Sequence, residues 1–308
     1  MPAPFRFSAS LAGTPADQLA DTARRAEELG FSTVTLSDHF TEQPAPLIGL
    51  MAAAAATSTL RVLPLVLAND YRNPIVVAQE LATLDAVSGG RLELGIGAGW
   101  MTTDYELSAI PLDSPGTRIE RLRESVDILM GLLRTGHVDH AGTHYTIAGD
   151  RPGPAPVQSH IPLLLAGGKP KMLRLAGEKA DIVGINPALT AGVIDERAGR
   201  NATLEETDRK IEWVREGAGE RFDALELQTR IHLAMITDDR EKVAAEMAPL
   251  LGISAEEALA SPHALVGSAQ QCVDEVQRWR DRWGLSYVSI NAENMEEFAP
   301  VVEALTGR

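Results

Sequence analysis

The chain has 308 residues, of which 44% are hydrophobic, and its 43 acidic and 28 basic residues give a formal net charge of −15. This length and composition allow one large domain or two small ones with a sizeable core, and without a run of 18 apolar residues no membrane span is expected. The acidic balance disfavours sequence-independent DNA binding, while one cysteine and no signal-peptide pattern at the N-terminus predict a reducing cytoplasm.

Expected strands alternate with expected helices along the whole chain. Short apolar or alternating runs predict strands at 5–10, 33–37, 63–67, 92–95, 163–166, 182–185, 228–235 and 287–291. Helical spacing and capping residues predict helices at 14–30, 44–58, 73–88, 114–135, 170–177, 203–220, 240–250, 268–283 and 295–305. The segment 101–115 is polar and mixed, which favours a long loop, and 136–147 is expected to form a hairpin.

Eight strands in alternation with helices predict an α/β fold, a (β/α)8 TIM barrel, formed by a single domain over residues 1–308. A doubly wound open sheet is the alternative that the same alternation allows. The proline-rich stretch 152–162 hints at a boundary, but we interpret the segment 101–160 as an insertion in one barrel. In parallel α/β folds ligands bind at the carboxyl ends of strands, so the residues that follow each strand are candidates for function.

Two of these strand ends carry distinctive residues. Asp38 and His39 end the second strand, where a histidine can exchange a proton near neutral pH, although a solvated loop histidine fits the position as well. Gly97, Ala98 and Gly99 follow the fourth strand without the spacing of a dinucleotide fingerprint. Small residues there would let the backbone approach a flat ligand closely, or would simply form a tight turn.

A third strand end suggests an anion site. Gly167 and Gly168 precede a helix that begins at Pro170. Exposed backbone amides and the positive end of a helix bind phosphate groups well, and an ordinary turn is the alternative. We expect Gly168→Asp to abolish cofactor binding while leaving the fold intact.

The sequence indicates neither a metal site nor a nucleophilic cysteine or serine. His137, His140 and His144 have a spacing seen in metal sites, yet alternation in the expected hairpin turns the first two to opposite faces, so no metal is expected. Cys272 lies among apolar helix positions, which indicates packing rather than a nucleophile. Neither a G-x-S-x-G elbow nor an H-E-x-x-H motif is present.

Taken in order, the motifs resemble a known family. They are the DH pair, an N-P helix start, GGRLELGIGAGW, an R-x-x-R-L-x-E-S helix at 118–125, a G-x-H-Y hairpin, and IPLLLAGGKPKMLRLAGEKADIVG. Over nearly the whole chain the sequence is similar to the bacterial luciferase-like flavin and deazaflavin oxidoreductases, and is closest to their coenzyme F420-dependent branch. The resemblance implies a barrel with insertions, usually dimeric, with F420 as cofactor and FMN as the alternative.

The resemblance also implies roles for individual residues. His39 would be the catalytic residue, beside the deazaflavin ring. The cofactor would be bound by Asp38, by a strand bulge that often contains a non-proline cis peptide (Leu65, Val66, Leu67, Ala68), by the glycine loop (Gly97, Ala98, Gly99), and at its phosphate by Ala166, Gly167 and Gly168. The apolar wall on the substrate side would be formed by Phe40, Tyr71 and Trp100. In the sugar-phosphate dehydrogenase members an acidic residue follows the glycine loop. Trp100 occupies that place here, so neither that substrate nor that proton-transfer role is expected.

These features predict an F420-dependent oxidoreductase that transfers a hydride between the deazaflavin and a small organic substrate. An FMN-dependent luciferase-like monooxygenase is the first alternative. A barrel with redox-free chemistry is the second, although no Schiff-base lysine, carboxylate pair or metal triad stands out for it. We expect a cytoplasmic homodimer that pairs through the helices at 44–58 and 73–88, with no nucleic acid or membrane as partner.

Overall fold

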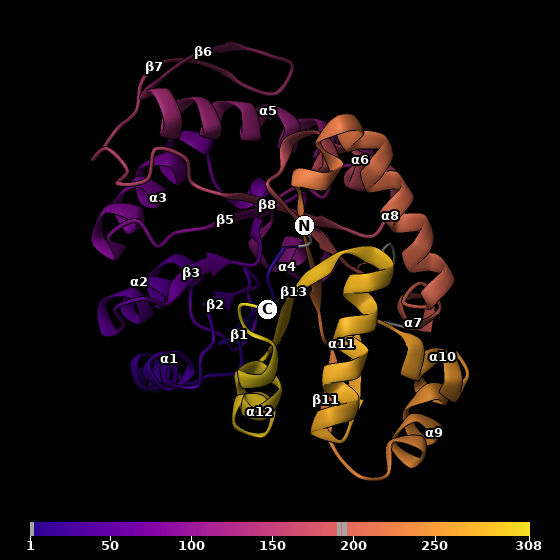
Figure 1. Cartoon of the computed structure of the whole chain (residues 1–308). Helices are drawn as coiled ribbons and strands as arrows, with labels where there is room; N and C mark the ends of the chain where they lie inside the picture. Colours follow the sequence, from indigo (N-terminus) through magenta and orange to yellow (C-terminus); the bar gives the residue numbers. More distant parts are fainter. Residues whose placement is uncertain (1–2, 190–191, 193–195) are drawn as a thin grey trace.

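A computed structural model of the chain describes residues 3–189, 192 and 196–308. Figure 1 shows strands gathered around a central axis and enclosed by a ring of helices. The main sheet is parallel throughout, in the order β3-β2-β1-β13-β10-β9-β8-β5-β4. Its strands are β1 (Arg6–Ser10), β2 (Thr33–Leu36), β3 (Arg61–Pro64), β4 (Leu67–Ala68), β5 (Leu94–Gly97), β8 (Leu163–Gly167), β9 (Ile182–Ile185), β10 (Glu226–Arg230) and β13 (Leu285–Asn291).

The sheet closes into a barrel through the segment that contains β3 and β4. These two strands are halves of one stretch of chain, interrupted at Leu65–Val66, where the peptide bond is cis. The first half pairs with β2 and the second with β5. The N–H of Val62 also donates to the carbonyl of Arg91 at 3.0 Å, and its own carbonyl accepts from the N–H of Glu93 at 3.0 Å. Counted as one bulged strand, the two halves complete the predicted barrel of eight, and the open-sheet alternative is wrong.

Helices cover the outside of the barrel, and many begin and end at the residues that the sequence indicates. The ring consists of α1 (Leu19–Glu28), α2 (Pro46–Ala56), α3 (Pro74–Ser88), α5 (Pro115–Thr135), α6 (Pro170–Lys179), α8 (Leu204–Ala218), α11 (Ala269–Trp283) and α12 (Met295–Leu305). Shorter elements are α4 (Thr102–Ser108), α7 (Glu196–Arg200), α9 (Arg240–Leu251), α10 (Ala255–Ala260) and the 3-10 turns η1 (Ala16–Gln18), η2 (Asn69–Tyr71), η3 (Gly219–Ala224) and η4 (Ala292–Asn294). For α3, the Asn73 side chain accepts from the N–H of Ile75, and Gly89 ends the helix at φ +68°. Within the described residues, no helix is both long and apolar enough to cross a membrane.

Three local predictions are wrong. The loop expected at 101–115 contains the helix α4, which sequence periodicity misses because it has only 7 residues. The strand expected at 228–235 is two strands, because the chain leaves the barrel after β10 and continues as β11 (Leu233–Ile236), which pairs with β12 (Ala264–Gly267) in a second sheet. The strand expected at 92–95 begins at Leu94, since the preceding residues bridge to β3 instead.

The expected hairpin is present as β6 (His137–Ala141) and β7 (Thr146–Asp150). Glu124 of α5 holds its loop by accepting the backbone N–H groups of residues 143–145 at 2.8–3.0 Å. Burial opposes ionisation of this carboxyl, but the backbone donors prevail and lower the pKa of Glu124 to about 2. Helix α5 packs against α3 and α6 in the ring (Figure 1), so this part of the segment 101–160 covers the barrel. That the segment is an insertion in one domain stays a prediction.

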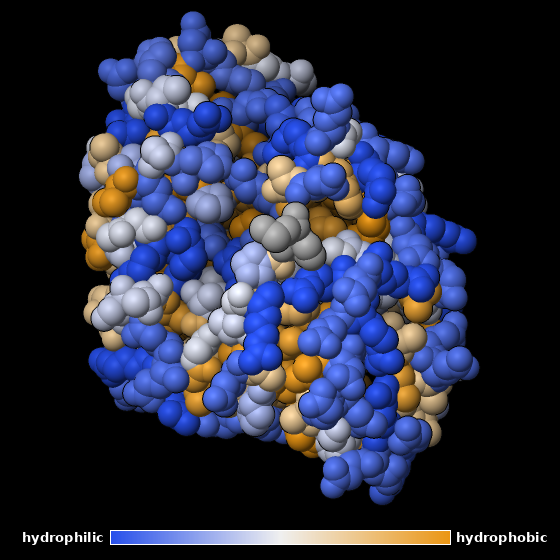
Figure 2. Space-filling view, viewed as in Figure 1, coloured by the Kyte–Doolittle hydropathy of each residue, from blue (hydrophilic) through white to orange (hydrophobic). Residues whose placement is uncertain are grey.

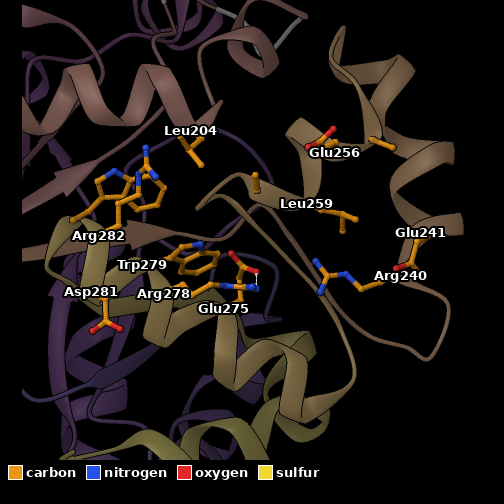
Figure 3. Close-up of a pocket in the computed structure, with 13 residues that line it drawn as sticks. Leu204, Arg240, Glu241, Glu256, Leu259, Glu275, Arg278, Trp279, Asp281 and Arg282 are labelled. Atoms are coloured by element: carbon orange, nitrogen blue, oxygen red, sulfur yellow. Dashed lines mark hydrogen bonds and ion pairs between the residues drawn. The ribbon is translucent and has the colours of Figure 1, made fainter.

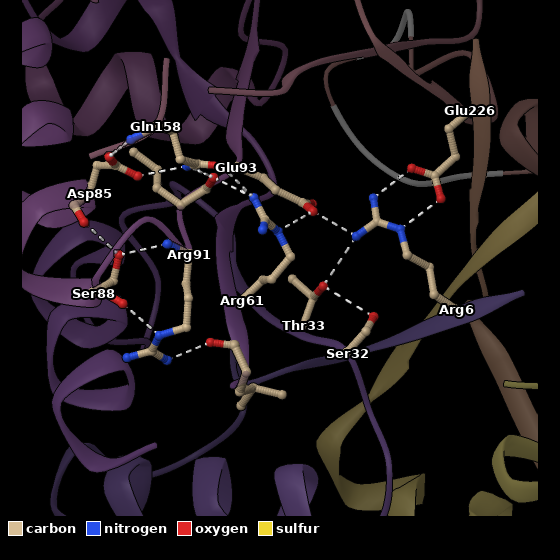
Figure 4. A network of polar contacts seen from close by, with 12 residues as sticks. Arg6, Ser32, Thr33, Arg61, Asp85, Ser88, Arg91, Glu93, Gln158 and Glu226 are labelled. Carbon is tan, nitrogen blue, oxygen red and sulfur yellow. Dashed lines mark hydrogen bonds and ion pairs between the residues drawn. The ribbon is translucent and has the colours of Figure 1, made fainter. Parts of the chain in front are cut away.

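A charged network joins the strands at the amino end of the barrel (Figure 4). Glu93, which is 2% exposed, accepts from Arg6 at 2.6 Å and from Arg61 at 2.7 Å. Arg6 also donates twice to Glu226, both times at 2.6 Å. The network therefore ties β1, β3, the entry to β5, and β10 together at the end opposite the one where barrels bind ligands, so we assign it to stability.

Candidate active site

At the carboxyl end of the barrel, His39 lies between two residues that follow β5. Its Nδ1 is 2.7 Å from Oδ2 of Asp104, and its ring meets Trp100 edge-on, with centroids 5.4 Å apart. Tyr71 donates to the same Asp104 oxygen at 3.2 Å, and the N–H of Phe40 donates to the other at 3.1 Å. The structure thus gathers the predicted catalytic residue and the predicted substrate-wall residues around one carboxylate.

Asp104 was missed by sequence reasoning. It is 2% exposed and lies in α4, inside the segment expected to be a loop. The available signal was weak, because one acidic residue in a polar stretch is ordinary. Burial, followed by the charge of Asp104, raises the pKa of the Tyr71 phenol above its usual value, so Tyr71 stays protonated and donates.

Aromatic rings form a wall next to His39. Phe40 and Tyr71 are stacked with centroids 4.8 Å apart, and Tyr71 meets Tyr105 in a T-shaped contact at 5.5 Å. The hydroxyl of Tyr105 donates to Asp70 at 3.0 Å, which anchors the wall on the protein side. Phe40 remains 42% exposed, so the wall offers apolar surface beside the imidazole.

Asp38 supports the bulge between β3 and β4. This buried carboxylate accepts from the N–H of Ala68 at 3.0 Å and from the Arg72 guanidinium, at 3.1 Å for Nη2. Both of its oxygens therefore have protein partners, and a direct contact between Asp38 and a cofactor stays a prediction. Leu65 and Val66 pack against a small buried cluster inside the barrel.

The glycines of β5 accommodate this bulge. A Cβ on Gly97 would lie 2.8 Å from Cγ2 of Val66, and a Cβ on Gly95 would collide with the carbonyl oxygen of Pro64. Gly97 also stands opposite Ala68 in the pairing of β5 with β4. The two glycines are therefore needed for the close approach of β5 to the neighbouring strand, whether or not a ligand binds there.

The loop after β5 is held by Arg118 of α5. The buried guanidinium donates to the carbonyl oxygens of Ala98, at 3.3 Å, and Gly99. Gly99 has φ +72°, and a side chain on it would collide with the Tyr105 hydroxyl. This backbone conformation places Trp100 against His39, so the last glycine of the motif is needed for the geometry of the site.

The expected phosphate-binding segment ends β8, which lies beside β5 in the sheet. A Cβ on Gly168 would come within 2.5 Å of the Asn186 carbonyl oxygen, and one on Gly167 within 2.5 Å of Cγ of Met172. The expectation that Gly168→Asp would spare the fold is therefore wrong, because a side chain there would displace the backbone after β9. Ala166 stands opposite Gly184 of β9 in the same ladder.

Helix α6 starts directly after these glycines and presents its amino end there. Its N-cap residue, Lys169, is exposed and makes no side-chain cap, so the first amides of the helix are left for an external acceptor. Close by, the buried Oδ1 of Asn186 has no hydrogen-bond partner among the described residues. The rim thus offers both donors for an anion and an acceptor for a polar ligand.

Comparison with known proteins places this geometry in a family. The sequence model that describes the family of luciferase-like monooxygenases matches residues 2–260 of this chain. The chain belongs to the luciferase-like monooxygenase family.

Relatives of this luciferase-like chain include F420-dependent glucose-6-phosphate dehydrogenases. The protein of Nocardia farcinica is 30% identical over 249 residues, which cover 75% of this chain and 69% of the relative. That of Amycolatopsis mediterranei is 30% identical over 211 residues, and the chain spans 63% of its length, just under two thirds. Among solved structures, the F420-dependent tetrahydromethanopterin reductase from Methanopyrus kandleri matches 99% of both chains with a TM-score of 0.78 at 20% identity, which supports the fold.

His137, His140 and the cysteine of this luciferase-like chain have surroundings that fit a structural role. In the described part of the chain, no cluster of three or more His, Cys, Asp or Glu side chains is arranged to hold a metal ion. His137 contacts Asp150 at 2.8 Å, and His140 contacts Glu124 at 3.3 Å. Burial raises the pKa of the Cys272 thiol to about 12, so it is no nucleophile at neutral pH.

A groove of about 830 Å³ lies elsewhere, between α11 and the helices α9 and α10 (Figure 3). Apolar residues such as Leu259 and Trp279 line it, together with charges of both signs, such as Arg240 and Glu256. None of the candidate residues at the barrel rim borders it. Because its charges are mixed, the groove has no evident preference for an anionic cofactor, and the candidate site of this luciferase-like chain stays at the rim.

Proposed function

We propose that the chain is a coenzyme F420-dependent oxidoreductase, which transfers a hydride between the deazaflavin and a small organic substrate. The His39–Asp104 pair carries the proposal, because it stands at the carboxyl rim of the barrel, where ligands bind in this fold. The F420-dependent dehydrogenases among its relatives support deazaflavin rather than flavin as the cofactor.

The rim has features that suit such a cofactor. The bulge at Leu65–Val66 and the loop from Gly97 to Gly99 would support the ring, and the amino end of α6 would hold the phosphate. The unpartnered Oδ1 of Asn186 would accept a hydrogen bond from a polar part of the cofactor. Against a net charge of −15, such local donors are needed to hold an anionic molecule.

The chain's own residues would do the rest of the chemistry. When bound, a deazaflavin supplies a two-electron hydride carrier. His39 would exchange the proton that accompanies the hydride, at its Nε2 atom. The rings of Phe40, Tyr71 and Trp100 would exclude water and hold the reacting carbon in place.

The substrate proposal stops at the chemical class. Trp100 occupies the position where the sugar-phosphate dehydrogenases of the family carry an acid. We therefore do not extend the glucose 6-phosphate of the relatives to this chain, and propose a small molecule with an apolar part that fits the aromatic wall.

Cofactor titration tests the proposal. Purified protein is titrated separately with F420 and with FMN while absorbance and fluorescence are followed. We expect saturable binding of F420 at micromolar concentration and much weaker binding of FMN. Preference for FMN would favour a luciferase-like monooxygenase, and binding of neither would favour a barrel with redox-free chemistry.

Lys169→Glu should weaken F420 binding about tenfold, because it exchanges a cation for an anion at the amino end of α6. Lys169 is exposed, so the fold should not change. Lys242→Glu is the matched control, since Lys242 is also exposed and lies in the first turn of a helix, α9, away from the rim. Equal affinities of the two variants would remove the start of α6 from the phosphate site.

We also propose a homodimer that pairs through α2 and α3. Ile48, Val76 and Val87 on these helices are exposed, and Figure 2 shows apolar side chains along the left edge, where α2 and α3 lie. Ile48→Glu should convert the dimer to a monomer at micromolar concentration, measured by sedimentation. Leu250→Glu on α9 should leave the mass unchanged, although Leu250 is 69% exposed, close to the 76% of Ile48. A monomeric mass for the unmodified chain would contradict the proposal.

A cytoplasmic location completes the proposal. The chain has one cysteine, Cys272, and it is buried as a free thiol. A reducing compartment suits such a protein, because nothing in its stability depends on a disulfide.

A further inference from the structure

We infer that Asp104 is a positioning residue that holds the proton of His39 on Nδ1 and so leaves Nε2 free as the base toward the substrate. The inference starts from the 2.7 Å contact between Nδ1 of His39 and Oδ2 of Asp104. It deepens the proposed function, because it assigns the substrate class that such a histidine serves.

Asp104 differs from the neighbouring carboxylates of the rim in the groups that it pairs with. Asp38 is paired with Arg72, and Asp70 with Arg121 at 3.0 Å. In the part of the chain that the structure describes, Asp104 has neither an arginine nor a lysine partner. It accepts from the backbone N–H of Phe40 and the hydroxyl of Tyr71, which are both neutral donors.

His39 is therefore the group placed to carry a positive charge against this buried carboxylate. An ionised carboxylate can only accept hydrogen bonds, so the imidazole nitrogen that faces it must carry a proton. In the neutral ring, the lone pair then belongs to Nε2. Asp104 both selects this tautomer and stabilises the imidazolium that forms when Nε2 takes up a proton.

The free nitrogen remains accessible. The His39 side chain is 22% exposed, and within residues 3–189, 192 and 196–308 its Nε2 has no hydrogen-bond partner. Trp100 packs edge-on against the ring. A substrate hydroxyl at the rim can therefore donate its proton to Nε2.

This arrangement matches an alcohol and carbonyl pair better than an alkene. In the oxidative direction the O–H bond would break and its proton would go to Nε2, while the C–H bond would break and its electron pair would leave as hydride, which a bound deazaflavin would accept. The carbonyl double bond forms from the O–H electrons. In reverse, the imidazolium returns the proton to the carbonyl oxygen as the hydride arrives at carbon.

The tautomer can be measured without substrate or cofactor. Protein labelled with ¹⁵N in its histidine rings is followed by NMR from about pH 6 to 10, a range that extends well above the ordinary pKa of a free imidazole. The His39 signals are assigned by their loss in His39→Gln. We expect the neutral ring to be protonated at Nδ1 in the unmodified chain, and at Nε2 in Asp104→Asn, whose amide can donate to Nδ1.

Controls make the result specific. Asp104→Glu keeps a carboxylate and should keep the proton on Nδ1. Asp113→Asn removes a rim carboxylate that pairs with Arg121 instead, and should leave the His39 signals unchanged. A neutral ring protonated at Nε2 in the unmodified chain overturns the inference, whether or not Asp104→Asn folds.

The readout also separates this inference from the proposed function. If F420 fails to bind but the tautomer switches in Asp104→Asn, the function is wrong and the role of Asp104 stands. If F420 binds and the tautomer does not depend on Asp104, the inference is wrong and the function stands. With an accepted alcohol, Asp104→Asn should lower kcat about 100-fold or more and change KM little.

Discussion

His39→Ala should lower turnover of an accepted substrate by about 10²–10³-fold, because loss of one well-placed polar contact in an active site has an effect of this size. Affinity for F420 should change only modestly, since the ring would still rest on the bulge and the glycine loop. The fold should survive, because the side chain is partly exposed and its contacts are at the rim. Stopped-flow absorbance of the cofactor measures the rate, and a separate titration measures the affinity.

Two further measurements identify the role of His39. Asparagine can donate a hydrogen bond to Asp104 but cannot take up a proton, so we expect His39→Asn to recover none of the lost rate. Added imidazole should restore part of the rate of His39→Ala. His160→Ala is the control, because His160 contacts Asp181, at the entry to β9, and should not matter for turnover. A rate for His39→Ala near that of the unmodified chain would mean that His39 is a solvated loop residue.

Glu93→Ala should lower the free energy of unfolding by about 3–5 kcal/mol, the usual result of removing one partner from a buried ion pair. Glu93 accepts from both Arg6 and Arg61 at the amino end of the barrel. Without Glu93, the partly buried guanidinium groups of Arg6 and Arg61 lose the negative charge that balances them. Arg6 keeps its pair with Glu226 and its contact with the Tyr287 ring, 3.7 Å from the centroid, so the chain should still fold.

Urea unfolding followed by circular dichroism measures this change, and an unchanged slope would confirm that the cooperative transition is the same. Glu212→Ala is the matched control, because Glu212 is exposed and lies 3.9 Å from Arg215, where an ion pair contributes little. Because the site is at the opposite end of the barrel, F420 affinity of folded Glu93→Ala should be unchanged. A loss below about 1 kcal/mol would show that the network does not stabilise the barrel.

The local sequence was sufficient for most of the fold. Residues that start a helix, such as Asn73 and Pro74, and residues that end one, such as Gly89, make their hydrogen bonds within one turn of the chain. They can therefore be recognised in the local sequence. The eight strands could be predicted for a similar reason, because a strand buried in a barrel is a short apolar run. The resemblance added a catalytic role for His39 and the bulge, and the structure has the bulge with a cis bond at Leu65–Val66.

The remaining features depend on how distant strand ends meet. Asp104 and His39 are 65 positions apart, and no local pattern indicates that α4 turns this carboxylate toward the imidazole. The strand expected at 228–235 contains no glycine, proline, asparagine or aspartate that would indicate a turn, yet the chain changes sheets within it. The sequence alone predicts Gly168 to be available for a ligand, but its backbone packs against the residues after β9. By itself the sequence determined most of the strands and helices, because their signals are local, but it did not determine α4 or the break between β10 and β11. The tertiary structure alone decided which side chains meet at the rim, because barrel closure sets those contacts.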